Sequence, residues 1–507
     1  MIVVLDFGSQ YTQLIARKIR QLSVYAEIHP YNVPLETIRS LQPRGIILSG
    51  GPSSIYDAGA PCLNPEIFGL NVPVLGICYG LQAMAHCLKG RVEKAPSREY
   101  GHKSIEVLNG DSLLKGLPKR SRVWMSHGDR VEKLPAGFEI LASSDTCGTA
   151  AVRHATKPLF GLQFHPEVHH TTHGERILAN FALNICGIKP DWTMGSFIDR
   201  TIEELRETVG KRRVVCAVSG GVDSTVMATL MHRAIGKQLR PVFVDNGVMR
   251  LNEPEQVVAM FRDQLHIPVI HKRSANRFLS QLKGIEDPEE KRRRIGREFI
   301  EVFFSELKDG DFLAQGTLYP DVIESVSTKG PSATIKTHHN RVKEVLALIR
   351  QNRVIEPLKE LFKDEVRAVG AELGIPHEVL WRHPFPGPGL AIRVLGEVTR
   401  ARLDLLRKAD AILIEELKSS GMYGKIWQAL AVLLPVRSVG VMGDFRTYDN
   451  VIALRCVEST DGMTADWVRM PEDVLARISS RIINEIRGIN RVVYDVSSKP
   501  PSTIEWE

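Results

Sequence analysis

Short runs of aliphatic and β-branched residues recur along the first third of the chain and alternate with segments of helical spacing. Such runs occupy residues 2–5, 45–49 and 72–77. Buried strands that alternate with helices are typical of a mainly parallel sheet covered on both faces. Functional loops of such sheets gather at the carboxyl ends of the strands, so we expect the segments after these three runs to lie together.

The middle of the chain repeats this alternation. We predict strands at 213–218, 241–245 and 267–270 and another beginning at 312, with helices at 222–235 and 289–307. The strand at 312 is predicted to enter an ordered loop that extends to residue 325. These elements indicate a second doubly wound, mainly parallel sheet.

The last part of the chain has another order of elements. It predicts a helix at 398–417, strands at 436–442 and 451–457, a helix at 472–486 and a strand at 491–496. The pattern breaks near residues 186 and 383. We therefore predict an α/β protein with two doubly wound domains, 1–186 and 187–382, followed by a small α+β domain, 383–507.

Composition limits the class of protein. The 507 residues are 43% hydrophobic and 25% charged, as in ordinary soluble globular proteins, and about three domains suit this length. The N-terminus has no basic segment or cleavage site, and no apolar run is long enough to span a membrane. Seven widely spaced cysteines without Cys-x-x-Cys pairs favour a reducing cytoplasm and no structural zinc. The net charge of +7 suits either nucleic acid or small phosphorylated substrates, but no basic and aromatic interleaving favours nucleic acid.

A glycine turn between the strand at 213–218 and the following helix predicts an anion site. The turn reads Ser219, Gly220, Gly221, Val222, Asp223, Ser224, Thr225. Free N–H groups and the positive end of the helix dipole bind phosphate at such a turn. An ordinary turn explains the two glycines alone, and the Gly-Lys-Ser/Thr end of a Walker loop is absent. The segment resembles the loop of the ATP pyrophosphatase family, which implies that it binds ATP.

Cys78 lies between Gly76 and Gly80 at the junction of a predicted strand and helix. This is the geometry of a nucleophile elbow, and a helix N-terminus stabilises a thiolate. A buried structural cysteine is the alternative. His165 is the candidate base and Glu167 the carboxylate that orients it.

Because it combines Cys78, His165 and Glu167 with Gly50-Gly51-Pro52, the segment from residue 1 to about 186 resembles the class I glutamine amidotransferases. The resemblance implies an oxyanion hole formed by the N–H groups of Gly51 and Tyr79. It also implies glutamine contacts by Gln82, Ser126, His127, Gly128 and Asp129.

Two clusters have alternative interpretations. His169 and His173, at helical spacing beside His170, could hold a metal, but a solvated loop is the simpler interpretation. Four cations at 291–294 are either a solvated helix face or an anion site.

The whole chain resembles the family of glutamine-hydrolysing GMP synthetases, including its Pro-Gly-rich run at 384–390 and its last ten residues. The resemblance implies amination of XMP at C2 after adenylation by ATP, with Asp223 as a Mg²⁺ ligand, Val244 at the ATP site and Lys336 on a lid. It also implies a homodimer through the C-terminal domain. Implied XMP contacts are Arg292, Gln428, Asp444, Lys499 and Glu505.

Two rival functions stay open at this point. Another ATP pyrophosphatase fused to an amidotransferase, similar to asparagine or NAD synthetases, would make a different amide. A non-enzymatic regulator on the same folds is expected to have lost Cys78, His165, Glu167 or Asp223, and all four are present.

Overall fold

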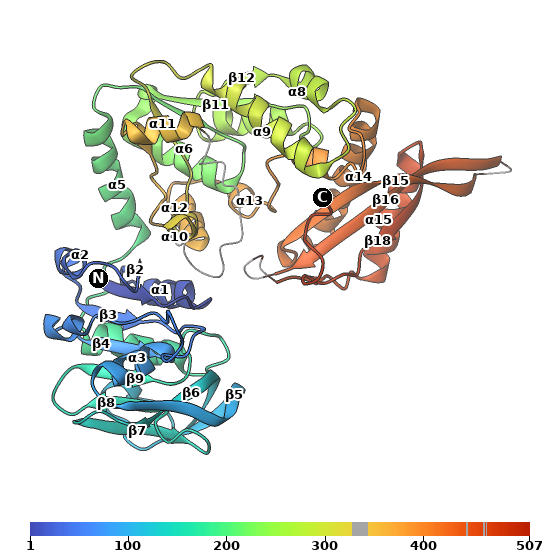
Figure 1. Cartoon of the computed structure of the whole chain (residues 1–507). Helices are drawn as coiled ribbons and strands as arrows, with labels where there is room; N and C mark the ends of the chain where they lie inside the picture. Colours follow the sequence, from blue (N-terminus) through green and yellow to red (C-terminus); the bar gives the residue numbers. More distant parts are fainter. Residues whose placement is uncertain (327–342, 443–444, 460–461, 463) are drawn as a thin grey trace. The chain divides into compact units, whose positions relative to one another are not determined.

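The computed structural model describes residues 1–507 except residues 327–342, 443–444, 460–461 and 463. Residue contacts divide the chain into two compact units, Met1–Phe197 with Pro320–Ile335, and Ile198–Tyr319 with Lys336–Glu507. Helix α5 (Met194–Val209) carries the chain from the first unit into the second (Figure 1). The predicted domain boundaries remain predictions, and the one near residue 383 falls inside the second unit.

A nine-stranded sheet forms the centre of the first unit, in the order β2-β1-β3-β4-β9-β8-β7-β5-β6. Its strands are β1 (Ile2–Asp6), β2 (Ala26–Pro30), β3 (Gly45–Leu48), β4 (Val74–Ile77), β5 (Arg91–Val107), β6 (Arg120–Lys133), β7 (Phe138–Ser144), β8 (Ala151–His154) and β9 (Leu159–Leu162). Its helices are α1 (Thr12–Gln21), α2 (Leu35–Leu41), α3 (Tyr79–Cys87) and α4 (Gly174–Ala179), the last continued by a π-helical turn. Helix α1 packs beside α4, and α3 packs on β3, β4 and β9.

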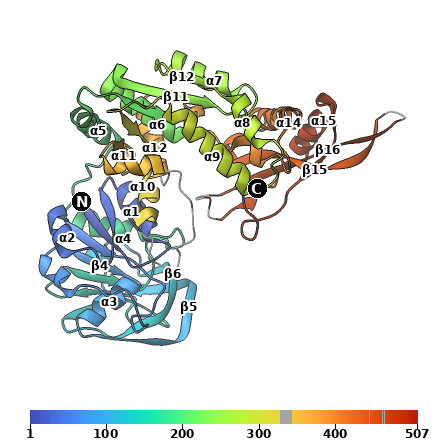
Figure 2. The ribbon, with the colours of Figure 1, turned by 45° about the horizontal axis from the view of Figure 1, so that its top comes forward.

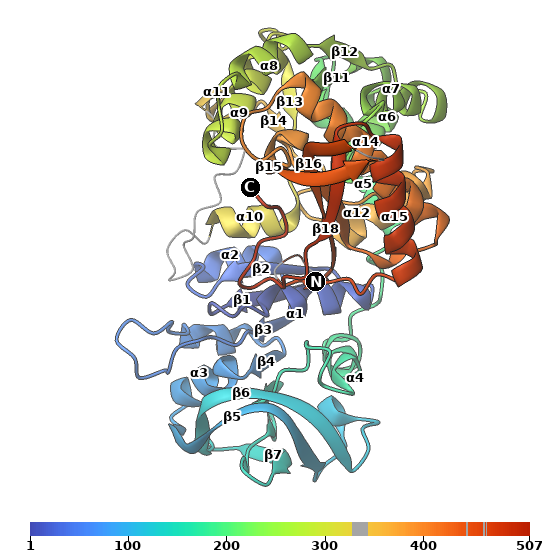
Figure 3. The same cartoon turned by 90° about the vertical axis from the view of Figure 1, so that its right-hand side faces the viewer.

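This sheet has a parallel and an antiparallel half. Strands β2, β1, β3, β4 and β9 pair in parallel, and β1, β3 and β4 are the strands that the apolar runs predict. Strands β8, β7, β5 and β6 continue the sheet in antiparallel pairs, and the long β5 and β6 curve along its edge (Figure 3). The sequence did not predict this half because β6 alternates buried and exposed residues and so contains no continuous apolar run.

The second unit begins with a five-stranded parallel sheet in the order β12-β11-β10-β13-β14. Its strands are β10 (Val214–Ala217), β11 (Leu239–Asp245), β12 (Ile270–Arg273), β13 (Phe312–Ala314) and β14 (Val354–Ile355). Its helices are α6 (Val222–Ile235), α7 (Glu253–Ala259), α8 (Ala275–Leu282), α9 (Pro288–Phe304), α11 (Lys343–Arg350), α12 (Lys363–Glu372) and α13 (His377–Leu380). Figure 2 shows β11 and β12 among these helices.

Two predictions for this region were wrong. The strand predicted at 267–270 begins at Ile270 instead, because β12 is an edge strand whose half-buried positions accept His271 and Lys272 and whose exposed end accepts Arg273. The predicted loop after β13 contains helix α10 (Tyr319–Val326), whose first turn holds Pro320, a position that suits proline because no N–H donor is needed there.

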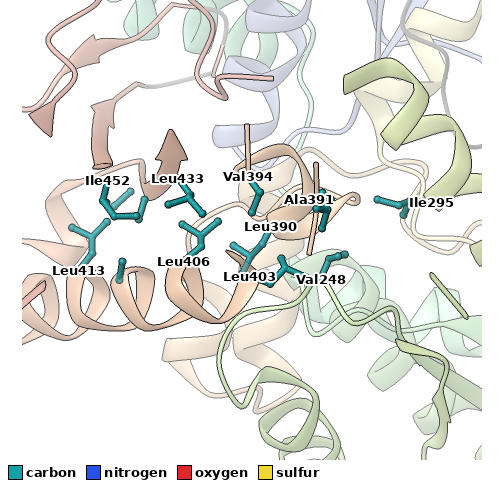
Figure 4. Packing of buried hydrophobic residues seen from close by; sticks show 14 of the residues in the cluster. Val248, Ile295, Leu390, Ala391, Val394, Leu403, Leu406, Leu413, Leu433 and Ile452 are labelled. Atoms are coloured by element: carbon teal, nitrogen blue, oxygen red, sulfur yellow. The ribbon is translucent and has the colours of Figure 1, made fainter. Parts of the chain in front are cut away.

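The C-terminal part contains β15 (Gln428–Met442), β16 (Phe445–Glu458), β17 (Asp466–Trp467) and β18 (Ile489–Tyr494), with α14 (Arg400–Ser419) and α15 (Glu472–Glu485). Strand β15 begins eight residues before the predicted strand, and its register shifts between Leu433 and Arg437, around Pro435. Figure 4 shows Leu413 and Leu406 of α14 directed toward Ile452 and Leu433, and Leu403 beside Leu390. The same buried cluster includes Val248 and Ile295, so one core joins the parallel sheet to the C-terminal part.

The predicted fold class is confirmed: two doubly wound α/β sheets are followed by a smaller α+β part. Among the described residues, no helix combines the length and the apolar character needed to cross a membrane.

Candidate active sites

Cys78 occupies a strained turn between β4 and α3. Its φ is +51°, a left-handed value that is unfavourable for a residue with a side chain. The flanking glycines make the turn possible, since a Cβ on Gly80 would lie 2.3 Å from the Leu48 carbonyl oxygen and one on Gly76 would lie 2.6 Å from the Leu81 nitrogen. The predicted nucleophile elbow is therefore present, and its strain is typical of functional sites.

His165 and Glu167 form a buried pair at this elbow. Their Nδ1 and Oε1 atoms are 2.7 Å apart, and both side chains are at most 4% exposed. Burial lowers the pKa of His165, but the charges of Glu167 and Cys78 oppose it, and the pKa lies well above its usual value. The backbone of His165 is fixed by bonds to Trp124 and Thr171.

Other contacts hold the thiol itself. Gln163 Nε2 lies 3.8 Å from Cys78 Sγ, and the thiol lies 3.6 Å from the Ser126 carbonyl oxygen. Burial raises the pKa of Cys186 and Cys216 to about 12, so these thiols stay protonated. Gln163 was not predicted as a site residue, although a polar residue in an otherwise apolar run is a signal for one.

The predicted oxyanion segment lies against the same residues. A Cβ on Gly50 would be 3.0 Å from His165 Cε1, and one on Gly51 would be 3.2 Å from Tyr79 Cγ. Only glycines allow this approach, which leaves the backbone of Gly51 beside the N-terminus of α3.

The predicted glutamine residues lie in the middle of β6 and on α3 beside it. Gln82 Nε2 donates to the Asp129 carbonyl oxygen at 2.8 Å. His127 lies 3.3 Å from Glu99, and both side chains are at most 3% exposed. Burial lowers the pKa of His127, against the opposing charge of Glu99. Glu99 was not predicted, because its pairing with His127 depends on strand register and not on a local motif.

The loop from Ser219 to Thr225 joins β10 to α6 as predicted. Gly220 has a φ of +74°, and a Cβ there would lie 2.4 Å from Val257 Cγ2. Ser219 and Ser224 hydroxyls are 3.1 Å apart, and Thr225 donates to the Gly221 carbonyl oxygen at 2.8 Å. These bonds fix a glycine turn at a helix N-terminus, which is suited to phosphate.

Asp223 forms an ion pair with a lysine that was not predicted as a site residue. Lys363 Nζ lies 2.6 Å from each Asp223 carboxylate oxygen. Lys363 begins α12, where a cation faces the positive end of the helix dipole, so Asp223 stabilises an otherwise unfavourable charge. The side chain of Val244 packs in the core, and its predicted contact with ATP could only use the backbone.

Of the predicted XMP residues, only Gln428 and Glu505 contact each other among the described residues. Gln428 Nε2 donates to Glu505 Oε1 at 2.6 Å. Arg292 donates to a backbone oxygen of Glu507, and Lys499 donates to the Gly462 carbonyl oxygen at 2.7 Å. Asp444 and the lid residue Lys336 lie outside the described residues.

The structure also shows the contacts of the two clusters that had alternative interpretations. The described residues contain no group of three or more His, Cys, Asp or Glu side chains that could hold a metal, and His170 stacks on Trp124. Of the cations at 291–294, Lys291 and Arg292 bond to Glu507, whereas Arg293 and Arg294 pair with Glu290 and Arg293 stays exposed to solvent.

Comparison with known proteins gives matches over the whole chain. The family model described as "Glutamine amidotransferase class-I" matches residues 3–185, and that of the "GMP synthase C terminal domain" matches residues 415–506. The chain is 59% identical to a GMP synthase [glutamine-hydrolyzing] of Chlorobium chlorochromatii and 56% identical to one of Nitratidesulfovibrio vulgaris. Each alignment covers 100% of this chain and 99% of the relative.

Proposed function

The chain belongs to the family of glutamine-hydrolysing GMP synthases, and we propose that Cys78 releases ammonia from glutamine while the Ser219 loop activates XMP with ATP. The observation that carries this proposal is the buried His165–Glu167 pair at the strained Cys78 elbow. The full-length matches disfavour an asparagine or NAD synthetase-like enzyme. A regulator without activity would not need a strained thiol beside a buried base.

In the first reaction, the Cys78 thiolate attacks the side-chain amide carbon of glutamine. The N–H groups of Gly51 and Tyr79 stabilise the developing oxyanion, and His165 donates a proton to the leaving ammonia. Glu167 holds the imidazole in place and stabilises its charge. Water then hydrolyses the thioester to glutamate with His165 as the base. Gln82, Ser126, His127, Gly128 and Asp129 are the proposed glutamine contacts.

In the second reaction, O2 of XMP attacks the α-phosphorus of ATP and pyrophosphate leaves. The N–H groups and hydroxyls from Ser219 to Thr225 hold the β- and γ-phosphates, because this turn presents free donors to an anion. Ammonia then attacks C2 of the adenylated base, AMP leaves and GMP forms.

Asp223 is the proposed Mg²⁺ ligand. Proteins commonly bind Mg²⁺ through one or two carboxylates together with substrate phosphates, and Asp223 supplies one carboxylate beside the phosphate turn. Its bond to Lys363 supports the proposal, since this carboxylate already attracts a cation. When bound, Mg²⁺ would offset phosphate charge, and Lys363 would be free to contact a phosphate oxygen.

The tail contributes the proposed XMP contacts Lys499 and Glu505, together with Gln428, Arg292 and Asp444. The ammonium of Lys499 suits a phosphate, and the carboxylate of Glu505 accepts N–H donors of a purine. The bond between Gln428 and Glu505 supports a common site for these two residues.

We also propose a homodimer that forms through the β15–β16 hairpin. Large apolar side chains are exposed along it, namely Val436, Val439, Val441, Phe445 and Tyr448. Figure 1 shows this part of the hairpin extending beyond the sheet. An exposed apolar strand pair is an interaction surface, and a second copy of the hairpin would cover it.

Analytical ultracentrifugation tests the dimer. The Val441→Lys/Phe445→Lys variant should sediment as a monomer, while the control Leu251→Lys, at an exposed apolar residue outside the hairpin, should stay dimeric. A hairpin variant that remains dimeric would exclude this interface.

We also propose a cytoplasmic location, with which the seven free cysteines are consistent.

The proposed function is tested by ATP-dependent pyrophosphate release with XMP, aspartate or deamido-NAD as the acceptor. Of the three acceptors, only XMP should support the release of pyrophosphate, and GMP should accumulate when glutamine is added. Release with aspartate or deamido-NAD, and none with XMP, would overturn the proposal.

A further inference from the structure

Arg393 is a fully buried arginine to which the proposed mechanism assigns no role. Its side chain is 0% exposed, and it follows the turn Gly389–Ile392 in the core that joins the parallel sheet to the C-terminal part. Figure 4 places its neighbours Ala391 and Val394 in this core, with Ile295 beyond Ala391. A buried guanidinium is retained only where partners compensate for its lost hydration, so its contacts indicate its role.

The guanidinium of Arg393 donates two parallel hydrogen bonds to the carboxylate of Glu505. Nε donates to Oε2 at 3.0 Å and Nη2 donates to Oε1 at 2.8 Å. Two such bonds fix the plane of a carboxylate as well as its position. Gln428 adds a third bond to Oε1 at 2.6 Å.

On its other side the guanidinium faces a buried carboxylate. Its Nη1 lies 3.8 Å from Oδ1 of Asp410, a residue that is 1% exposed. Asp410 also pairs with Arg250 at 3.0 Å, and both arginines lie over the ring of Phe385 in the Pro-Gly-rich run. The charge of Asp410 and the ring of Phe385 stabilise the guanidinium in the orientation in which it bonds Glu505.

The Glu505 carboxylate can still accept a further hydrogen bond. A carboxylate has about four acceptor positions, and the three bonds that the described residues make to Glu505 leave one position, on Oε2. The Glu505 side chain is 18% exposed, so it keeps access to solvent although Arg393 has none. The free position can accept one N–H donor, which a purine ring offers.

We propose that Arg393, held by Asp410, is a positioning residue that fixes the Glu505 carboxylate for an N–H group of the XMP base. This inference rests on the proposed role of Glu505 in XMP binding. Arg393 does not touch the substrate and acts only through Glu505. Lysine keeps the charge but cannot form the two parallel bonds, so Arg393→Lys isolates the geometric part of the interaction.

Steady-state kinetics with ammonium as the nitrogen source test the proposal in Arg393→Lys, Glu505→Gln and the double variant. Arg393→Lys should raise KM for XMP about ten- to hundredfold and change KM for ATP less than about twofold, because only a charged hydrogen bond to the base weakens. The double variant should be no worse than Glu505→Gln, since Arg393 has no other route to XMP. The control Arg481→Lys, at another arginine that bonds a buried glutamate, Glu416, should leave both KM values unchanged.

Three outcomes would overturn the inference: an Arg393→Lys variant that behaves like the control, equal losses for XMP and ATP, or losses that add in the double variant. If Arg393→Lys does not fold, Asp410→Asn replaces it, and an unchanged KM for XMP in that variant also overturns the inference. A Glu505→Gln variant with normal KM for XMP would instead contradict the proposed role of Glu505. The two failures are therefore distinguishable.

Discussion

Opposing influences determine the charge state of the His165 side chain. Burial disfavours its charged form, whereas Glu167 and Cys78 favour it strongly enough to raise the pKa well above the usual value. Because this pKa is raised in the folded state, the pair stabilises the protein fully below the unfolded value near 6.5. That stabilisation is lost as the pH rises through the folded pKa.

Glu167→Gln should lower the pKa of His165, because burial remains while its main compensating charge is removed. The glutaminase rate should fall on the order of 10²-fold or more, as expected when a base loses its orienting carboxylate. Titration by NMR of the histidine ring and a glutamate-release assay measure the two effects. The matched control is Glu175→Gln, at an exposed glutamate in the first turn of α4. An unchanged His165 pKa in Glu167→Gln would show that Glu167 does not hold the charge.

At the level of elements, the sequence predicted those features that local chemistry determines. The Cys78 elbow and the Ser219 loop each combine an apolar strand, glycines and a helix start within about ten residues, so their geometry is encoded locally. Gln163, Glu99, Lys363 and Arg393 escaped prediction as site residues, because each meets its partner across strands or distant segments. The antiparallel half of the first sheet escaped for the related reason that alternating strands carry a weaker signal than apolar runs.

The Ser219 loop yields a prediction about Asp223. Asp223→Asn should abolish GMP formation from both glutamine and ammonia, because adenylation precedes the use of either nitrogen source and the neutral amide attracts Mg²⁺ and Lys363 less strongly. Pyrophosphate release measures the step directly. The control Asp199→Asn changes an exposed aspartate of α5 and should be active. Normal XMP-dependent pyrophosphate release in Asp223→Asn would rule out this role.

The tail is joined to α9 by a buried ion pair. Lys291 is 0% exposed and its Nζ lies 2.5 Å from Glu507 Oε2 and 2.8 Å from the Val394 carbonyl oxygen. Burial lowers the pKa of Lys291, and Glu507 opposes this effect. Removal of Glu507 therefore leaves a buried ammonium without its counter-charge.

Glu507→Leu should destabilise the protein by roughly 3–5 kcal/mol, the cost of breaking a buried pair. Lys291→Met added to it should recover most of the loss, because no unpaired charge then remains. Thermal unfolding measures both effects. Glu485→Ala, which removes the exposed partner of Arg481, is the control and should cost less than about 1 kcal/mol. If the double variant is as unstable as Glu507→Leu, the unpaired charge of Lys291 is not the cause of the destabilisation.

At the scale of the whole molecule, the two proposed reactions belong to different compact units. Cys78, His165 and Glu167 lie within Met1–Phe197, and the Ser219 loop, Asp223 and Glu505 lie within the second unit. Each set of residues is positioned by the sheet and core of its own unit. Loss of glutamine hydrolysis should therefore leave the activation and amination of XMP intact. The two reactions share only ammonia as an intermediate.

The most direct test of this division of labour is GMP formation by Cys78→Ala with glutamine or with an ammonium salt, at a pH where free ammonia is appreciable. Without the thiol no thioester can form, so glutamine should support essentially no GMP. Ammonium should support a rate close to that of the wild type, with ATP, XMP and Mg²⁺ present. Cys87→Ala, at a half-buried cysteine in the last turn of the same helix, should retain both reactions. GMP formation from glutamine by Cys78→Ala, or loss of the ammonium reaction by the folded variant, would contradict the account.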